Sequence, residues 1–148
     1  MKTKVAIIIP CFNEEDSIEN VLIELKEFCP NYDYIIINDC STDNTSEIAR
    51  KSGLAEVIDL SVNLGIGGAV QTGLRYAMKN KYDYALKYDA DGQHRANEVD
   101  LILKPIIAKN ADVVIGSRFL YTGNDGFKSS FIRRIVMPPF SWTGSISV

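Results

Sequence analysis

The stretch Lys87-Tyr88-Asp89-Ala90-Asp91-Gly92-Gln93-His94 places two carboxylates, one residue apart, directly after an apolar run that begins at Tyr82. The run predicts a strand that ends at Asp89, so both acids lie at the strand's carboxyl end. Like charges this close repel each other unless a cation lies between them. A divalent metal that also binds ligand phosphates is the simplest such cation. Asp-x-Asp also occurs in ordinary solvated loops, so the surrounding chain has to decide.

The composition indicates one soluble globular domain. The chain has 148 residues, of which 46% are hydrophobic and 24% charged, and its formal net charge is −3, so it can bury a substantial core. No block of lysine and arginine precedes the C-terminal tail, which argues against nucleic-acid binding. Cys11, Cys29 and Cys40 form no Cys-x-x-Cys motif and fit reduced, packed thiols. No apolar run is long enough for a signal peptide or a membrane span, and we expect a cytoplasmic protein.

Short apolar runs alternate with amphipathic helical patterns along most of the chain. Continuous runs rich in β-branched residues are typical of strands buried on both faces of a parallel sheet. Strands that alternate with helices predict right-handed βαβ units. The expected fold is therefore α/β: an open, mostly parallel, Rossmann-like sheet with helices on both faces. The expected strands are residues 5–9 (closed by Pro10), 34–37, 57–60, 83–88 and 111–116, and the expected helices are residues 18–28, 45–52 (followed by Gly53), the segment after the turn 65–68, and 99–107, the last kinked or bounded by Pro105.

Polar residues follow each expected strand. Because ligands of open α/β sheets bind outside the carboxyl ends of the strands, these clusters should share one edge and one ligand. Their coincidence on one edge is stronger evidence for a binding site than any single motif. The clusters are Asn13/Glu14, Asn38/Asp39, Asn63/Gly65, Asp89/Asp91 and Ser117/Arg118.

The chain after Arg118 is less regular. Residues 127–136 combine apolar and basic side chains at helical spacing, which fits either a packed helix or a helix at a membrane surface. Residues 140–148 show no periodicity. The sequence ends as though a longer protein had been cut.

The order of these pieces resembles the family 2 glycosyltransferases of the GT-A fold. The resemblance covers about residues 4 to 119 and keeps the family's order, which makes it specific. The Asp-Gly-Gln-His form and the Gly-Ser-Arg-Phe segment are most similar to the dolichol- or polyprenyl-phosphate sugar synthase branch. The matching stretches are residues 9–15, 38–45, 63–69, 89–94 and 116–119.

The resemblance implies a donor-binding region over residues 1–119, with residues 120–148 beginning an acceptor-side region that the chain does not complete. It implies an inverting transfer of sugar from a UDP- or GDP-sugar to a polyprenyl-phosphate or saccharide acceptor, possible contact with the inner face of a membrane, and no particular oligomeric state. It implies that Asp89, Asp91 and Gln93 hold Mg2+ or Mn2+ against the diphosphate. The residues implied to bind the nucleotide sugar are Pro10, Phe12, Glu14, Ile37, Asp39, Asp89, Ala90 and Arg118.

The sequence departs from the family at several places. The family often has aspartate where Asn38 stands, glycine where Cys40 stands, and proline where Arg95-Ala96 follows His94. The family's acceptor half, which supplies the catalytic base in many members, lies beyond the end of this chain. No catalytic base can be assigned, although an acceptor phosphate is already an anion and needs none in the lipid-phosphate branch.

The candidate residues also have structural interpretations. Asp39 could cap the helix that follows it, although Asp43 serves that purpose equally well, and Glu14 could only favour its helix dipole. His94, the only histidine, is of a type more often structural than ligating when it occurs alone, and for Gln93 both roles are open.

Two other functions compete with sugar transfer. The chain could be a binding module that holds a nucleotide sugar without turnover. A phosphotransferase of the haloacid dehalogenase type also uses Asp-x-Asp after a strand, but there the motif follows the first strand and Thr or Val usually stands at the position of Gln93.

Overall fold

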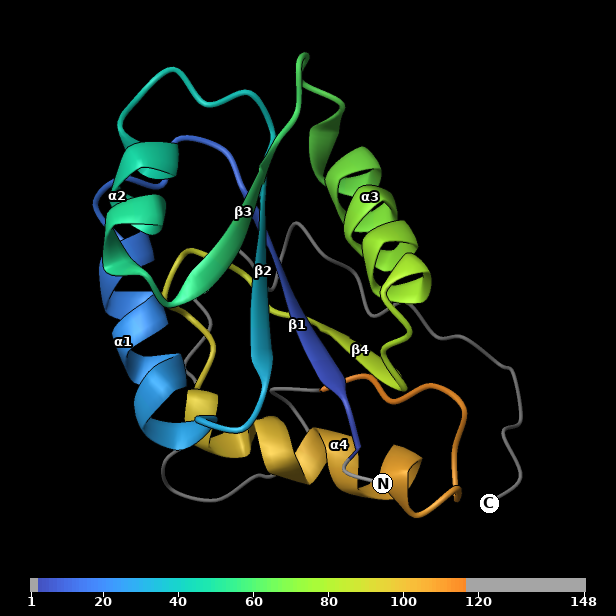
Figure 1. Ribbon diagram of the computed structural model, residues 1–148. Coiled ribbons are helices and arrows are strands. Elements are labelled where there is room, and N and C mark those ends of the chain that lie inside the picture. The colour runs from blue at the N-terminus through green and yellow to red at the C-terminus, as the bar shows by residue number, and fades with distance from the viewer. Residues whose placement is uncertain (1–2, 117–148) are drawn as a thin grey trace, which may run out of the picture. The chain divides into compact units, whose positions relative to one another are not determined.

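The computed structural model describes residues 3–116, and within them it contains a sheet of four parallel strands in the order β3-β2-β1-β4. Figure 1 shows this sheet with its helices. The strands are β1 (Val5–Cys11), β2 (Asp33–Asn38), β3 (Ala55–Asp59) and β4 (Tyr84–Lys87). The helices are α1 (Ile18–Phe28), α2 (Thr45–Ser52), α3 (Gly65–Lys79), the short 3-10 helix η1 (Ala96–Glu98) and α4 (Val99–Ile107).

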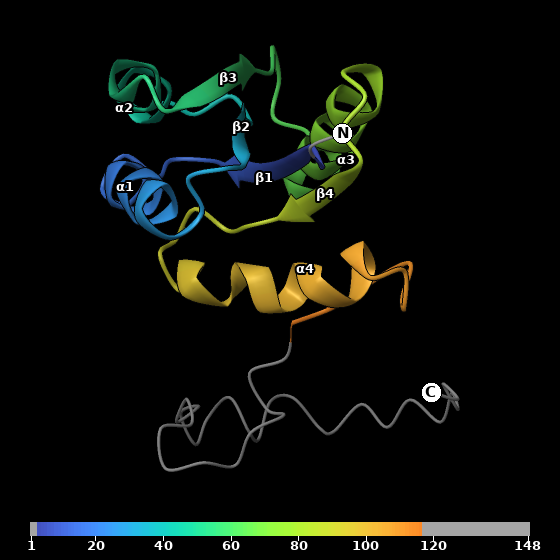
Figure 2. The same ribbon diagram turned by 60° about the horizontal axis from the view of Figure 1, so that its bottom comes forward.

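Helices cover both faces of the sheet, as the sequence predicts. Figure 2 shows α1 and α2 on one side of the strands and α3 on the other. Alternate residues of β1 divide between the two faces: Ile7 and Ile9 pack with α1, whereas Ile8 packs with α3. All three side chains are fully buried, so β1 lies at the centre of both halves of the core.

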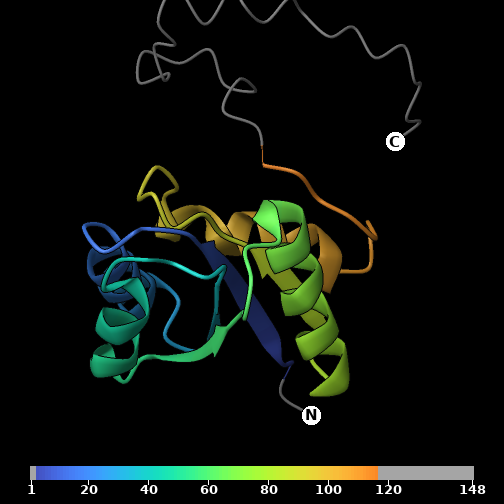
Figure 3. The same ribbon diagram turned by 90° about the horizontal axis from the view of Figure 1, so that it is seen from above.

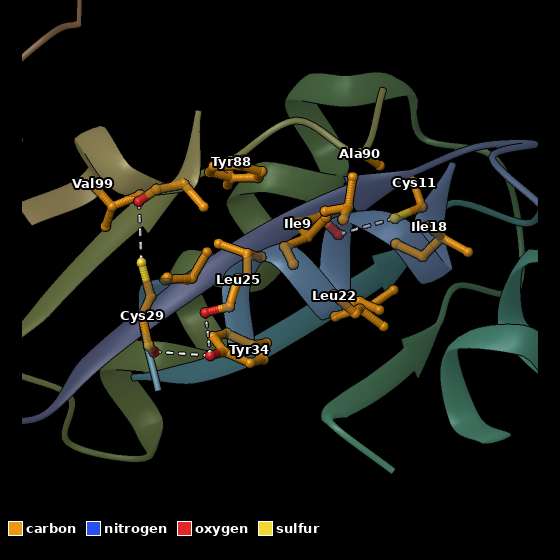
Figure 4. Close-up of a cluster of buried hydrophobic side chains, with 14 of the residues drawn as sticks. Ile9, Cys11, Ile18, Leu22, Leu25, Cys29, Tyr34, Tyr88, Ala90 and Val99 are labelled. Carbon is orange, nitrogen blue, oxygen red and sulfur yellow. Dashed lines mark hydrogen bonds between the residues drawn. The ribbon is translucent and has the colours of Figure 1, made fainter. Parts of the chain in front are cut away.

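The larger half of the core holds the chain before and after β4 against α1. Figure 4 shows Tyr88, Ala90 and Val99 packed with helix residues such as Leu22 and Leu25. Tyr34 of β2 belongs to this cluster, and its hydroxyl shares its one hydrogen between the carbonyl oxygens of Leu25 and Cys29, at 2.9 and 2.8 Å. The residues on either side of Asp89 are therefore anchored in the core.

Two expectations about strands need correction. Pro10 lies inside β1 and does not close it. The Ile8 carbonyl accepts from Tyr88 N–H, so the backbone of Ile8, and that of Pro10 two residues on, faces the β4 side. The pairing of β1 with β4 ends at Ile8 and Lys87, before Pro10. The N–H that proline lacks is therefore not needed for a hydrogen bond of the sheet.

The expected fifth strand, residues 111–116, is not a strand in the described part of the chain. A buried strand needs a neighbour on at least one edge, whereas Val113 is 75% exposed. Pro105 lies within α4, which ends at Ile107. The expected helix over residues 127–136 falls outside the described residues.

Candidate functional site

A pocket of about 310 Å³ lies beyond the carboxyl ends of the strands. The loops after β2 and β3, at the top of Figure 1, face the viewer in Figure 3. The pocket collects residues from the end of β1, from the segments after β1, β2 and β4, and from the start of α3. Its lining is Pro10, Cys11, Phe12, Glu14, Asp39, Ile66, Ala69, Asp89, Ala90 and Asp91.

Most of the residues implied by the resemblance to bind donor or metal line this one pocket. Ile37 does not, because its side chain is fully buried in the core cluster on the α3 side of the sheet. Gln93 is exposed and lies outside the lining, and Arg118 lies outside the described residues. Cys11, Ile66 and Ala69 were not expected, although the glycine-rich turn that opens α3 was a signal for the last two.

The wall formed by the segment after β1 is fixed to the segment after β2. Asn13 has a positive φ of 55°, and its side-chain oxygen accepts from Thr42 N–H at 2.8 Å. Its own N–H donates to Ser41 Oγ at 3.0 Å, while Glu14 N–H donates to Thr45 Oγ1 at 2.8 Å. These cross-loop bonds set the positions of Phe12 and Glu14.

Asp39 connects the sheet to α3. Its side chain is buried, and Oδ1 accepts from the N–H of Leu64, the residue before α3, at 2.7 Å. At the start of the helix after Asp39, it is Asp43 whose Oδ1 accepts from the N–H of Thr45, the first helical residue, at 3.0 Å. Burial alone raises the pKa of Asp43, but the hydrogen bonds from Thr45 and Glu15 hold it below its ordinary value. Asp39 is therefore not needed to cap α2.

Glu14 has both a structural contact and a place in the pocket. Its Oε2 accepts from Ser17 Oγ at 2.7 Å, and its carbonyl accepts from Ile18 N–H at 3.0 Å, so it supports the start of α1. Because it also lines the pocket, the two interpretations of this residue do not exclude each other.

The acid pair after β4 is partly neutralised by the chain itself. Lys87 Nζ forms an ion pair with Asp89 Oδ1, and His94 Nε2 lies 2.7 Å from Asp89 Oδ2. Burial alone raises the pKa of Asp89, but the hydrogen bonds from Lys87 and His94 hold it below its ordinary value. Asp91 Oδ1 accepts from Gln93 N–H at 2.9 Å. Like-charge repulsion therefore does not by itself require a metal.

His94 is also braced from behind. The buried Tyr88 hydroxyl donates to the His94 carbonyl oxygen at 2.9 Å, and the two rings lie 5.4 Å apart between centroids. These contacts close the loop on itself and hold the imidazole against Asp89. They give the only histidine a structural partner, so its presence needs no ligand.

The two carboxylates after β4 are the candidate metal ligands of the pocket. No group of three or more His, Cys, Asp or Glu side chains within residues 3–116 is arranged to hold one. Asp89 and Asp91 nevertheless line the same pocket. Mg2+ is commonly held by one or two carboxylates together with ligand phosphates, so this pair fits a hard divalent ion that takes its other ligands from a diphosphate.

The asparagine at position 38 has a local explanation, whereas the conformation of Cys40 accounts for the glycine of the family and not for the cysteine. Asn38 Nδ2 donates to Asp59 Oδ1 at 2.8 Å, a bond that an aspartate at this position could not make. Asp59 also pairs with Arg50 at 2.7 Å. Cys40 has a φ of 61°, a conformation that glycine adopts more easily.

The fold and the pocket define an α/β domain that binds its ligand outside the carboxyl ends of a parallel sheet. Residues 6–144 match the model of the family described as "Glycosyl transferase family 2", and the chain belongs to that family. The predicted family is thereby confirmed.

Curated relatives belong to the predicted branch. The chain is 37% identical over 129 residues to the UDP-N-acetylglucosamine--dolichyl-phosphate N-acetylglucosaminyltransferase of Methanococcus voltae, a match covering 76% of this chain and 51% of the relative. It is 30% identical over 147 residues to the undecaprenyl-phosphate mannosyltransferase of Micrococcus luteus, covering 97% and 58%. The chain thus spans about half the length of these relatives.

A solved structure supports the predicted GT-A fold. Glucosyl-3-phosphoglycerate synthase from Mycobacterium tuberculosis, in complex with Mn2+, uridine diphosphate and glucosyl-3-phosphoglycerate, matches with a TM-score of 0.58 at 23% identity, covering 70% of this chain and 39% of that one. In the part of the chain described by the structure, no helix has both the length and the apolar character needed to cross a membrane.

Proposed function

We propose that this chain is the donor-binding part of a metal-dependent, inverting glycosyltransferase that moves a sugar from a UDP- or GDP-sugar to a polyprenyl-phosphate or saccharide acceptor. The supporting observation is the convergence of Glu14, Asp39, Asp89 and Asp91 on one pocket from the segments after β1, β2 and β4. The family match and the names of the two relatives support the class of reaction.

The charge of the pocket supports the metal. Its lining within the described residues contains these carboxylates and no lysine or arginine; Lys87, which lies outside the lining, pairs with only one of the four, Asp89, so the pocket keeps a net negative charge. An anionic diphosphate is repelled from such a surface unless a cation accompanies it. Asp89 and Asp91 would hold the ion, with Gln93 as a further predicted ligand. When bound, a divalent ion stabilises the charge that develops on the departing nucleoside diphosphate.

The chain's own residues bind and orient the donor. The segment Pro10–Phe12 offers backbone and an aromatic ring to the nucleoside, and Phe12 is 48% exposed and therefore available for contact. Asp39 is held in place through Leu64, which orients its carboxylate for base or ribose hydrogen donors. Arg118 remains a predicted phosphate partner.

Binding tests the donor site. Calorimetric titration with UDP and GDP should show at least tenfold tighter binding with Mn2+ than without it, a difference of about 1.4 kcal/mol or more. Asp91→Asn should remove the metal dependence, whereas Glu27→Gln, which changes an exposed acid on α1, should not. Equal nucleotide binding with and without Mn2+ would refute the proposed metal role.

Turnover is a separate question, because the chain spans about half of its relatives' length. A donor-binding fragment without transfer activity is the second candidate. Incubating the 148-residue chain with UDP-N-acetylglucosamine or GDP-mannose, Mn2+ and a polyprenyl phosphate, and measuring nucleotide release, separates the two. Acceptor-dependent release supports transfer, and tight donor binding without release supports the fragment. The cytoplasmic membrane face and the domain boundary near residue 119 stay predictions of this proposal.

A further inference from the structure

Lys87 lies at the last position of β4 and reaches forward to the acid pair. Its ammonium contacts Asp89 Oδ1, with the lysine and aspartate side chains 42% and 30% exposed. The other oxygen, Oδ2, is contacted by His94. Both oxygens of the carboxylate that faces the pocket therefore already have partners supplied by the chain.

A divalent ion and an ammonium compete for the same oxygen. An ammonium has three donors and no lone pair, so it contributes nothing to the coordination of a metal and repels it. An ion that binds Asp89 Oδ1 is repelled by the Lys87 ammonium at the same oxygen, and this repulsion favours displacement of the lysine. The lysine stem is flexible, so its head can move away while β4 stays paired with β1 through the Ile8–Lys87 register.

The displaced ammonium has a better partner only when a diphosphate is present. The pocket lining itself carries carboxylates, but these are the groups that a metal would occupy. A diphosphate brings additional negative charge to the same place. Displacement of Lys87 is thus more favourable when metal and nucleotide arrive together than when the metal arrives alone.

We propose that Lys87 is a positioning residue that occupies Asp89 in the ligand-free pocket, weakens the binding of a divalent metal alone, and couples metal binding to the binding of a nucleoside diphosphate. This inference rests on the proposed function, because it takes Asp89 as a metal ligand. It assigns Lys87 a role in specificity for the metal–nucleotide complex over the free ion. Thermodynamic linkage requires that the coupling be reciprocal.

The test is a Mn2+ titration followed by electron paramagnetic resonance, which measures the free ion directly, on the 148-residue chain with and without UDP or GDP. Lys87→Met keeps the apolar stem and removes the charge. It should bind Mn2+ alone about tenfold tighter, or ~1.4 kcal/mol, and the gain in Mn2+ affinity on adding nucleotide should shrink. Lys87→Arg keeps the charge and should remain close to the wild type. If Lys87→Met does not fold, Lys87→Gln replaces it.

Lys104→Met is the matched control, because Lys104 is exposed on α4 and forms no ion pair within residues 3–116. It should leave both affinities unchanged. Tighter Mn2+ binding by Lys104→Met as well would reduce the effect to net charge and overturn the inference, as would unchanged or weaker Mn2+ binding by Lys87→Met.

The outcomes separate this inference from the proposed function. If the wild type binds UDP or GDP in a Mn2+-dependent way and Lys87→Met gains nothing, the inference fails and the function stands. If neither nucleotide binds but Lys87→Met still gains Mn2+ affinity, Lys87 does weaken the binding of the free ion, whereas the coupling to nucleotide and the proposed function both fail. If no variant binds Mn2+ at all, both are refuted.

Discussion

Gly73, near the middle of α3, offers the sharpest test of how that helix meets the sheet. A Cβ built at this position lies 2.3 Å from Ile8 Cγ2 and 3.3 Å from Ile37 Cγ1. An ordinary carbon–carbon contact needs about 3.5 to 4.0 Å. Both isoleucines are fully buried, and Ile8 belongs to the central strand, so they have little room to move. Gly73→Ala must therefore push α3 away from the sheet.

The magnitude follows from two opposing effects. Overpacking a core costs about 1 to 3 kcal/mol, and alanine in place of glycine within a helix gains about 1 kcal/mol. Gly67→Ala in the same helix is the matched control, because no atom lies within 4 Å of its Cβ. The gain in helix propensity cancels when the free energies of unfolding of the two variants are subtracted. The remaining difference is the cost of overpacking, which we expect near the upper end of its range, at about 3 kcal/mol.

Denaturant unfolding followed by circular dichroism measures this difference. Gly73→Ala should unfold at lower denaturant than the wild type, and Gly67→Ala at the same or higher denaturant. Because α3 carries Ile66 and Ala69 of the pocket lining, Gly73→Ala should also weaken nucleotide binding. Equal stability of the two variants would show that α3 does not approach the sheet as closely as described.

Three further changes test local interactions. Asn38→Asp places a second carboxylate against Asp59, so it should lower the free energy of unfolding by about 1 to 3 kcal/mol, and adding Asp59→Asn should recover part of the loss in the same denaturation assay. Asp43→Asn weakens the contact with Thr45; because the pKa of Asp43 is lowered in the folded state, its stabilisation is present above about pH 4 and is lost as the pH falls through the folded pKa. The stability gap between wild type and Asp43→Asn should therefore close in acid, and a gap independent of pH would contradict this. Cys40→Gly relieves a positive φ, which costs a residue with a side chain about 1 to 2 kcal/mol, so it should raise the melting temperature; a lower melting temperature would show that the thiol contributes packing.

The sequence predicts those features that depend on neighbouring residues, such as where a helix begins and ends. The bounds of α2 match the expected residues 45–52, and Gly53 has the left-handed φ of 64° expected after a helix. The convergence of Glu14, Asp39, Asp89 and Asp91 on one pocket followed from the rule that parallel strands share a carboxyl edge. These features depend on order along the chain, which the sequence displays directly.

Other features depend on register and on helix placement, which the sequence does not display. The Asn38–Asp59 bond exists because β2 and β3 pair those residues directly. Cys11 enters the pocket because β1 continues past Pro10, and Ile66 because of where α3 begins. An apolar run such as residues 111–116 does not reveal whether a neighbouring strand is available to pair with it. In the sequence Lys87 is one more residue of an expected strand, and its contact with Asp89 depends on the conformation of the chain after β4.

The cross-loop bonds around Asn13 have a consequence for selectivity among donors. Several hydrogen bonds hold that side of the pocket in place. It is therefore preorganised and loses little conformational entropy when a ligand binds. The side that carries Ile66 begins at Leu64, whose N–H donates to Asp39 Oδ1. Discrimination between a small and a large base should therefore arise on the Ile66 side, because Ile66 is 63% exposed and its side chain has room to move, and amide hydrogen exchange should slow there more than near Asn13 when nucleotide is added.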